Sequence, residues 1–598
     1  MRSRYWETVG RSRSTRRRFL GTGAALGTGA AGLALVGCGN DDEEVDARPD
    51  ADDDDDTGPT PDTNGNGDED RHGGVARYPM VGLSSGDPPT LFPFENLTYL
   101  AQHPATLHYS LLLTDVTGAD ISPDDFTELE GDLAESLPEQ PDDLTYTFKL
   151  RENVFFHDKA PLDGRQATAE DFAETYQAFL SLSQNAGTFE AVIDRVEAVD
   201  DFTVQVTLNE PFAPFLTTHA SSPEGVWFIP VVTIESGQVQ TDPVGTGPFI
   251  FEEWDTGVAI NWNRNPDWYL EGVPYFDRLE VSMTADPQRI LAGLRAGEFD
   301  HSWLSSAIYD EAQEQLDAEG HHQFHGNGVW SGFYFNFDND DGRWQDKRVR
   351  QALSMSIDRA STLGVIDQTG EGDWFSPCVA SNMEPFFLSP REHADQYGES
   401  AKLFEFNPQE ARQLFEAATG ESTPSLRITA NIDRYGRVAE QTWELHAAQI
   451  REAGWDVELT YQEYGSYIQS TYLGDIPEGV GLGPLIGSPR DPNDIMSRNI
   501  ASSSARHNWG GSAIEEMDRV DELIAEQARI LDHDERVQFI HDMQVEMADY
   551  VLFVPNHAAA GYAYANPWVQ NFHWKNSYAV HRTTVLNSWF TPERRQRG

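Results

Sequence analysis

One short string has the residue spacing of a nucleophilic serine. Gly82–Gly86 reads GLSSG, which in many hydrolases places a reactive serine on a sharp turn between a strand and a helix. Asp87, Pro88 and Pro89 follow directly, and prolines at these places prevent the helix that the turn needs. We therefore assign no serine nucleophile and predict that the protein is not an enzyme.

Two further strings resemble metal sites. HHQFH, with His321, His322 and His325, could present imidazoles to a metal ion, although a hydrophilic loop explains the same residues. NFDNDDG, over residues 336–342, is similar to a calcium loop, but its glycine falls one place late. Lys347 also stands where such a loop needs a bidentate glutamate. The sequence favours a protein with neither a metal nor another cofactor.

The first 37 residues have the features of an export signal. Arg16 and Arg17 lie in the string TRRRFL, and a weakly apolar stretch rich in Gly and Ala follows it, which resembles a twin-arginine signal. The stretch ends in LVGC, which resembles a lipobox that would make Cys38 the lipidated first residue. An uncleaved single-pass anchor is the alternative interpretation. Both place the body of the protein on the outer face of the cell membrane.

Acidic residues outnumber basic ones along the whole chain. There are 99 Asp and Glu against 42 Lys and Arg, which gives a net charge of −57. Residues 38–74 are rich in Asp, Gly and Pro without any periodicity and predict a disordered linker. The body beyond them remains strongly acidic and contains almost no lysine. This pattern favours a halophilic protein whose surface stays hydrated in molar salt, and it excludes nucleic acid as a partner.

The body alternates between strand and helix patterns. Residues 144–150 (LTYTFKL) and 203–208 (TVQVTL) alternate apolar with polar residues and predict half-buried strands. Residues 168–180 begin with a capping box and predict a helix, as do residues 408–418 after the N-cap Asn407. Such mixing predicts an α/β protein of several lobes.

Two other strings predict local structure. In DKRVRQALSMSIDR (346–359), the apolar residues lie on one helix face, and Arg348, Arg350 and Arg359 are predicted to be solvated ion pairs outside it. In VGTGPF, Gly245 and Gly247 predict a tight turn before a strand, with a purely structural role.

Six strings in one order resemble the extracellular solute-binding proteins of family 5, the class of dipeptide, oligopeptide and nickel binders. The resemblance covers nearly all of residues 75–598. The strings are LAESLPEQPDDLTYTFKLRENVFFHDKAPLDGRQATAEDFAETY (133–176), DPVGTGPFIFEEWDTGVAINWNRNPDWY (242–269), RILAGLRAGEFD (289–300), DKRVRQALSMSIDR, FNPQEARQLFEAA (406–418) and DELIAEQARILDHDERVQFIHDMQVEM (521–547).

The resemblance implies a three-lobed α/β fold of the periplasmic-binding-protein type II kind, with a hinge and a cleft. Lobe I would be discontinuous, lobe II would be inserted in it, and lobe III would close on lobe I over a ligand. The expected boundaries are 75–112, 232–325 and 556–598 for lobe I, 113–231 for lobe II and 326–555 for lobe III.

The resemblance also implies where a ligand would be held. In lobe I, Ser84, Ser85 and Gly86 stand where family members offer backbone groups to it. In lobe III the family's anchor for a peptide amino group is an aspartate that falls on Ser488 here, which puts a free peptide N-terminus in doubt. The remaining candidates have structural alternatives, namely core packing or a turn; they are Trp330, Tyr334, Arg490 and Asp491.

The function implied is that of a monomeric, lipid-anchored substrate-binding subunit of an ABC importer. It would capture an oligopeptide-like solute and present it to a membrane permease. The alternatives are a binding protein for another solute, such as a metal chelate or a sugar oligomer, a sensor, and a secreted hydrolase.

Overall fold

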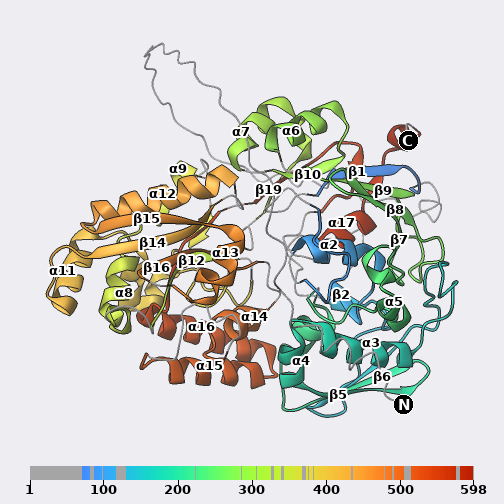
Figure 1. Ribbon diagram of the computed structural model, residues 1–598, viewed down its shortest axis with the longest axis horizontal. Helices are drawn as coiled ribbons and strands as arrows, with labels where there is room; N and C mark the ends of the chain where they lie inside the picture. Colours follow the sequence, from blue (N-terminus) through green and yellow to red (C-terminus); the bar gives the residue numbers. More distant parts are fainter. Residues whose placement is uncertain are drawn as a thin grey trace, which may run out of the picture. The chain divides into compact units, whose positions relative to one another are not determined.

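The computed structural model describes most of the chain from Arg71 onward (Figure 1). Residues Glu69–Gly598 form one compact unit. The predicted export arginines Arg16 and Arg17 and the predicted lipidation site Cys38 lie outside the described residues. The described ranges are 71–80, 87–96, 99–115, 129–222, 224–284, 286–304, 306–324, 329–337, 342–366, 372–374, 376–381, 383–432, 436–476, 478–487, 491–503, 514–559, 561–573 and 580–596.

A four-stranded sheet opens the body, with strand order β1-β9-β8-β7. β1 runs parallel to β9, whereas the other neighbours are antiparallel. Its inner face is fully buried at Trp262, Leu279 and Val281, and helix α2 packs against β7. The elements are β1 (Val75–Pro79), α2 (Tyr99–His108), α5 (Val231–Ser236), β7 (Phe249–Asp255), β8 (Ala259–Arg264) and β9 (Arg278–Ser282).

Two glycines directly before β1 bond to the segment that precedes β9. The N–H of Gly73 donates to the Tyr275 carbonyl over 2.9 Å, and the Gly74 carbonyl accepts from the N–H of Asp277 over 3.0 Å. Both glycines adopt positive φ angles, which glycine reaches without strain. These contacts hold Gly73 and Gly74 against the segment before β9; the linker boundary at residue 74 stays a prediction.

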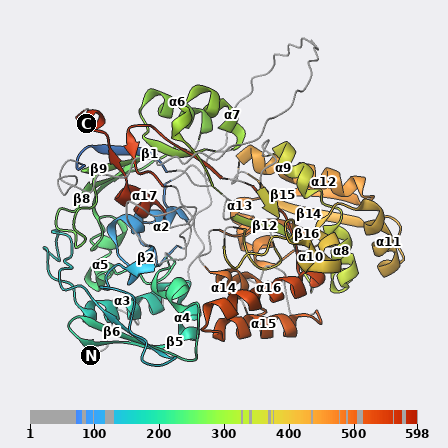
Figure 2. The same cartoon turned by 180° about the vertical axis from the view of Figure 1, so that it is seen from behind.

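A second sheet, β4-β6-β5, carries helices α3 and α4 (Figures 1 and 2). The alternating patterns predicted its strands correctly, since Tyr146, Phe148, Val204 and Val206 are buried. The capping box of α3 is also confirmed, because Thr168 and Asp171 satisfy each other's backbone N–H groups. The elements are β4 (Thr145–Lys149), α3 (Ala169–Leu182), α4 (Ala186–Val192), β5 (Ile193–Asp200) and β6 (Thr203–Leu208).

A third sheet joins distant parts of the chain in the order β10-β19-β11. β19 pairs antiparallel with both neighbours, so a segment near the C-terminus completes a sheet begun 260 residues earlier, from His301 to Gly561. Helices α6 and α7 cover it through a small apolar cluster that includes Leu294 and Tyr562. The elements are α6 (Pro287–Ala296), β10 (His301–Leu304), α7 (Ser306–Gln315), β11 (His321–Phe324) and β19 (Gly561–Ala565).

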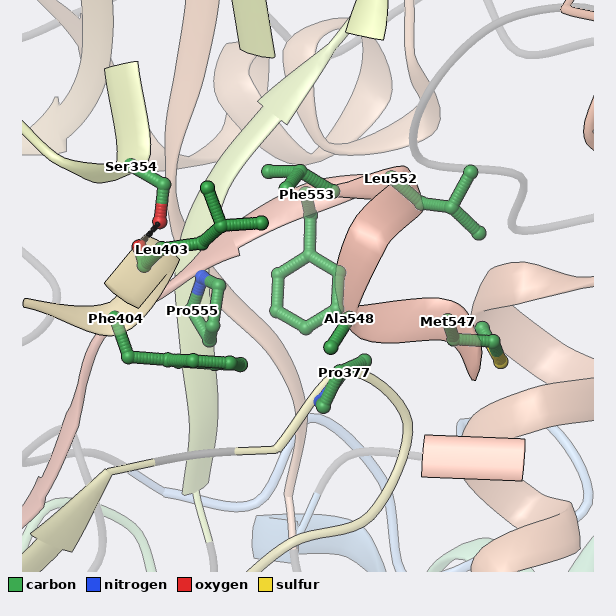
Figure 3. A pocket seen from close by; sticks show the side chains of 10 residues that line it. Ser354, Pro377, Leu403, Phe404, Met547, Ala548, Leu552, Phe553 and Pro555 are labelled. Carbon is green, nitrogen blue, oxygen red and sulfur yellow. Dashed lines mark hydrogen bonds between the residues drawn. The ribbon is translucent and has the colours of Figure 1, made fainter. Parts of the chain in front are cut away.

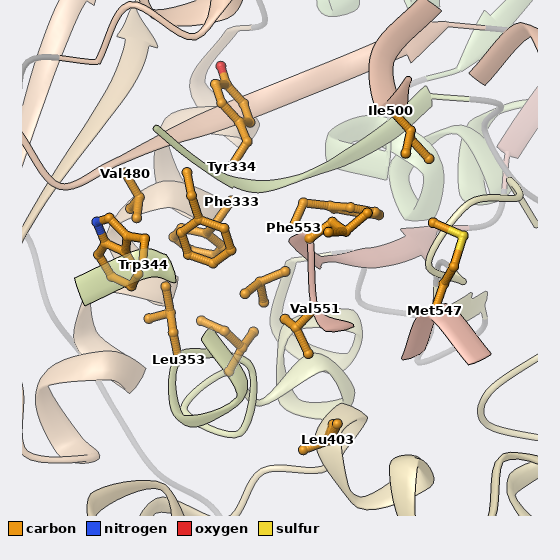
Figure 4. Packing of buried hydrophobic residues seen from close by; sticks show 14 of the residues in the cluster. Phe333, Tyr334, Trp344, Leu353, Leu403, Val480, Ile500, Met547, Val551 and Phe553 are labelled. Carbon is orange, nitrogen blue, oxygen red and sulfur yellow. The ribbon is translucent and has the colours of Figure 1, made fainter. Parts of the chain in front are cut away.

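The largest sheet has five strands in the order β15-β14-β16-β12-β17. β14 is parallel to β15 and β16, and β12 is antiparallel to β16 and β17. Phe333, Trp344, Leu353 and Phe553 lie in the core against it (Figure 4). The elements are β12 (Val329–Phe335), α8 (Lys347–Ser354), α9 (Arg359–Ile366), α11 (Pro408–Thr419), β14 (Ser425–Ile432), α12 (Gly436–Glu452), β15 (Asp456–Glu463), α13 (Tyr464–Gln469), β16 (Val480–Gly487), α14 (Pro492–Ile495), α15 (Met517–Arg529), α16 (His533–Tyr550) and β17 (Phe553–Pro555).

Three two-stranded sheets and short helices complete the described chain. The two-stranded sheets are β2-β3, β13-β18 and β20-β21. Helix α11 begins after its predicted N-cap, Asn407, whose side chain accepts from the N–H of Glu410. The remaining elements are β2 (Leu113–Asp115), β3 (Leu129–Gly131), β13 (Gly372–Trp374), α10 (Ala394–Tyr397), β18 (His557–Ala559), β20 (Val569–Gln570), α17 (Val580–Asn587), β21 (Trp589–Phe590) and α18 (Pro592–Arg595).

The prediction of solvated arginines over residues 346–359 is wrong for two of the three. Arg348 is exposed and pairs with Asp346, but Arg350 and Arg359 are buried, with 0% and 1% of their surface exposed. Arg350 donates to the carbonyls of Trp344 and Tyr550, and Arg359 donates to those of Phe404 and Pro555. Arginine has five donors in a fixed fork, so each side chain ties several loop carbonyls together. The helix also ends at Ser354, and α9 begins separately.

The predicted tight turn at Gly245 and Gly247 packs against the end of α2. A Cβ atom on Gly245 would lie 1.9 Å from the carbonyl oxygen of His108. His157 holds the turn from the other side: its Nε2 donates to the Gly247 carbonyl over 3.0 Å, and its Nδ1 accepts from the N–H of Gly245 over 3.3 Å. The turn therefore needs glycine for close approach, in agreement with a structural role.

Substituting Gly245 with alanine should lower the free energy of unfolding by about 1–3 kcal/mol, because the new methyl group has to displace backbone. Urea unfolding at constant salt would measure the change. Gly187→Ala is the matched control, since a Cβ there meets no atom within 4 Å and lies in helix α4. Equal midpoints for the two variants would contradict this interpretation.

The sheets follow one another along the chain much as the three predicted lobes do. β12 starts at Val329 and β17 ends at Pro555, both in the five-stranded sheet. β18 pairs with β13, which follows α9, and the chain then returns to the β10-β19-β11 sheet at Gly561. The division into three lobes stays a prediction that this order of sheets supports, and we keep the names lobe I, II and III for the residue ranges given above.

Candidate functional site

The chain passes twice between the β10-β19-β11 sheet and the five-stranded sheet. On the way out, β11 ends at Phe324 and β12 begins at Val329. On the way back, β18 ends at Ala559 and β19 begins at Gly561. A hinge between these two sheets would have to bend at or near these two short passages.

The candidate ligand segment of lobe III continues from strand β16. β16 ends at Gly487, which pairs with Val329 at the start of β12. Ser488 and Arg490 follow β16 but lie outside the described residues, as do Ser84, Ser85 and Gly86 after β1. The backbone of Trp330 pairs with Ile486, and its side chain is likewise not described. The structure thus fixes the strand ends that flank these candidates.

Tyr334, a predicted ligand contact, lies in the core. None of its surface is exposed, and its hydroxyl is hydrogen-bonded to that of Tyr467, which in turn donates to the Leu482 carbonyl. The two rings fit because β16 carries glycines: a Cβ on Gly481 would meet the Tyr334 ring at 2.3 Å, and one on Gly483 would meet the Tyr467 hydroxyl at 2.3 Å. This placement supports the packing alternative for Tyr334.

Asp491, the other described candidate, has both carboxylate oxygens engaged. It caps α14 by accepting from the N–H of Asn493 over 2.8 Å, and Arg536 donates to its two oxygens over 2.8 and 2.6 Å. Asp491 is 2% exposed and Arg536 is 5% exposed. The carboxylate therefore fixes the start of α14 against α16 and thereby the end of the segment that carries Ser488 and Arg490.

A second buried ion-pair cluster lies one turn further along. Arg498, in the π-helical turn η8 (Met496–Ile500), pairs with Asp494 over 3.2 Å and with Glu224 from lobe II. His219 lies against the rings of Phe189 and Phe215. Burial, together with the positive charge of Arg498, lowers the pKa of His219 to about 3.

Acid should destabilise the protein through His219 and through His157, whose pKa burial lowers to about 4. Because both folded-state pKa values lie below the ordinary value near 6.5, the unfolded state takes up protons first, and stability falls as the pH drops through 6.5 toward 4. We expect a loss of about 2–3 kcal/mol from each histidine at pH 4.5. Urea unfolding at pH 7 and pH 4.5, at one high salt concentration, would measure it.

His219→Phe is the informative variant, because a ring that does not titrate would fit beside Phe189 and Phe215. The variant should lose the His219 share of the pH dependence and keep the rest. An unchanged pH dependence in the variant would show that folding does not shift the pKa of His219.

The predicted histidine string does not gather at one point. His321 and His322 are consecutive residues of strand β11, so their side chains leave opposite faces of the sheet. His321 contacts the rings of Tyr309 and Tyr564, and His322 contacts Phe572. His325 lies outside the described residues. Among the residues that the structure describes, no group of three or more His, Cys, Asp or Glu could hold a metal ion.

Two of the pockets in the described part lie away from the candidate site. The first, about 10 Å³, is a packing gap in lobe III between Ser354, Leu403, Phe404 and Phe553, and Figure 3 shows their side chains around it. The second has a volume of about 290 Å³. It is lined by residues from the first half of the chain and from the C-terminal segment, among them Glu130, Arg151, Tyr275 and Trp589. The gap in Figure 3 is apolar and has room for hardly one water molecule.

Solved structures share this arrangement of sheets. One of them is the periplasmic binding protein DppA from Helicobacter pylori in complex with the peptide STSA. It superposes with a TM-score of 0.70 at 20% sequence identity, and the match covers 87% of this chain and 99% of DppA. The fold is thus the α/β, type II-like fold of periplasmic binding proteins, as predicted. Within the described residues no helix is long and apolar enough to cross a membrane.

Sequence comparison identifies the family. Residues 128–496 match the model of bacterial extracellular solute-binding proteins, family 5, and the chain belongs to that family. A di/tripeptide-binding protein from Pseudomonas aeruginosa is 26% identical over 62% of this chain and 70% of its own length. Heme-binding protein A from Haemophilus influenzae is 26% identical over 75% of this chain and 82% of its own. The chain is accordingly a solute-binding protein and not an enzyme.

Proposed function

We propose that this protein is the substrate-binding subunit of an ABC importer and that it captures an oligopeptide-like solute between lobes I and III. The observation that supports the proposal is the pair of short passages, 324–329 and 559–561, by which the chain leaves the β10-β19-β11 sheet and returns to it. Two lobes joined by short connections can close around a ligand that contacts both, and a permease can recognise that state.

The ligand class rests on the relatives and on the candidate segment. Similar proteins are named for di- and tripeptides, but one is named for heme, so the family alone leaves the solute open. By the resemblance to peptide binders, Ser488 replaces the aspartate that would pair with a peptide ammonium group. We therefore propose an oligopeptide-like solute that is not held through a free N-terminus, with Ser84, Ser85, Gly86, Trp330, Ser488 and Arg490 as contacts.

Export and anchoring complete the proposal. Arg16 and Arg17 would direct the folded protein through the twin-arginine route, and a lipidated Cys38 would hold it at the outer face of the membrane. Residues 38–74, as a linker, would then give the body reach toward a permease. The acidic composition supports a halophilic protein that works as a monomer in high salt.

Native mass spectrometry of protein purified in high salt from its own cells would test the function. We expect one solute per chain, released intact on denaturation and rebound by the refolded protein. A peptide without a free amino terminus would support the proposed class, whereas a metal chelate or sugar oligomer would replace it. Conversion of the solute during incubation would contradict the binding function altogether.

A further inference from the structure

The cluster of Glu224, Asp494 and Arg498 joins two regions that are far apart in the sequence. Glu224 ends the turn that follows the π-helical segment η2 (Leu216–Ala220) in lobe II, and Arg498 lies 274 residues later in lobe III. The three side chains are 7–8% exposed. Asn185 also donates to the Glu224 carbonyl over 3.1 Å, so the glutamate is held from within its own lobe.

Further bonds surround this cluster along the same face. The N–H of Ala213 donates to the Ala528 carbonyl over 2.7 Å, and the Thr217 hydroxyl lies 3.4 Å from a carboxylate oxygen of Asp491. At the rim, Arg529 pairs with Glu210 over 2.8 Å, with about half of each side chain exposed. The contact between lobes II and III thus has a buried ion pair at its centre and a solvent-exposed ion pair at its rim.

The buried centre and the exposed rim should respond differently to salt. Exposed pairs are screened by salt and contribute little, whereas buried pairs are screened much less. Glu224 and Arg498 are buried, at 7% and 8% exposure. Among the described residues, we therefore expect their ion pair to persist in concentrated salt better than the exposed Glu210–Arg529 pair.

Asp494 and Arg498 of the cluster lie on the elements that follow the candidate ligand segment in the chain. α14 and η8 continue from Ser488–Asp491, so a contact that fixes Arg498 also limits where the segment can lie. We propose that Glu224 and Arg498 form a latch by which lobe II positions the ligand segment of lobe III. Both act as positioning residues and touch no ligand; this inference rests on the proposed function, because it assigns lobe II a part in binding.

Substitutions of the two latch residues should differ in their effect on stability. Glu224→Gln keeps the shape of the side chain and leaves Arg498 paired with Asp494. Arg498→Met instead leaves two buried carboxylates without their cation, which is strongly destabilising. Glu224→Gln is consequently the variant of choice, and Arg498→Lys, which keeps the charge with fewer donors, is the second.

The test combines two measurements in high salt. Hydrogen exchange of the amides of residues 493–500 in the ligand-free protein reports on the latch itself. Native mass spectrometry with a library of short peptides, some with blocked amino termini, reports on binding. In Glu224→Gln we expect about tenfold faster exchange and about tenfold weaker peptide binding, with an intermediate effect in Arg498→Lys. Arg529→Gln, at the rim, is the control and should match the wild type in both.

Each outcome decides a separate point. Unchanged exchange in both latch variants would refute the latch. Faster exchange with unchanged binding would refute its positioning role while leaving the ionic contact in place. A wild-type protein that binds no member of the library would count against the proposed peptide ligand, and the exchange data would still decide whether the latch exists.

Discussion

Replacing Asp491 with asparagine is expected to lower the free energy of unfolding by about 3–5 kcal/mol. Asparagine caps a helix about as well as aspartate, so the cap of α14 would survive. The loss comes from Arg536, which would stay buried without the carboxylate that now accepts two of its hydrogen bonds. Urea unfolding at constant salt, followed by circular dichroism, would give the change.

Asp346→Asn is a closely matched control for this variant. Asp346 also caps a helix, α8, and also pairs with an arginine, Arg348, but this pair is exposed to solvent. An exposed pair contributes about 0–1 kcal/mol, so the control should unfold almost as the wild type does. Similar losses in the two variants would show that the buried Asp491–Arg536 pair contributes no more to stability than the exposed Asp346–Arg348 pair.

Lowering the salt concentration should unfold the protein. Its net charge of −57 makes the compact state repel itself, and only dissolved ions screen that repulsion. The screening length grows from about 3 Å at 1 M salt to about 30 Å at 0.01 M, so more of the acidic surface interacts as salt is removed. We expect the urea midpoint to fall steadily on dilution and native circular dichroism to be lost near the low end.

The choice of salt separates screening from specific ion binding. Sodium chloride and choline chloride at equal ionic strength should protect equally if screening is responsible. Protection by sodium alone would indicate bound cations instead. A protein that is as stable in dilute buffer as in molar salt would refute the halophilic interpretation, although not the binding function.

Local patterns predicted the elements well, because their causes lie within a few residues. The capping box at Thr168, the N-cap at Asn407 and the alternation in β4 and β6 all depend on short-range geometry. Arg350 and Arg359 were misassigned because a charged residue beside an apolar stripe is usually solvated. Their partners, the carbonyls at Tyr550 and Pro555, lie about 200 residues away along the chain.

The candidate site was harder to predict, because its contacts are long-range. Nothing near Asp491 in the sequence indicates Arg536, and nothing near Arg498 indicates Glu224. The sequence does contain one signal for the position of Tyr334. The segment from Val329 to Phe335 is mostly apolar, which is typical of a strand buried on both faces. That pattern favours core packing for Tyr334 over a ligand contact.

The central claim is that lobes I and III close on a solute, and a distance measurement between them tests it most directly. Spin labels at Val258→Cys in lobe I and Val365→Cys in lobe III would sit on residues that are 57% and 60% exposed. With Cys38 replaced by alanine, the one remaining native cysteine is Cys378, which is fully buried. The pair Val232→Cys and Val258→Cys, both in lobe I, serves as the control.

Pulsed electron–electron double resonance would record the distance distribution of each spin-label pair, with and without the solute released from the native protein. We predict that saturating solute shortens and narrows the distances between positions 258 and 365 and leaves those between 232 and 258 unchanged. Identical distributions for the first pair in the two states would contradict closure of the lobes on a ligand.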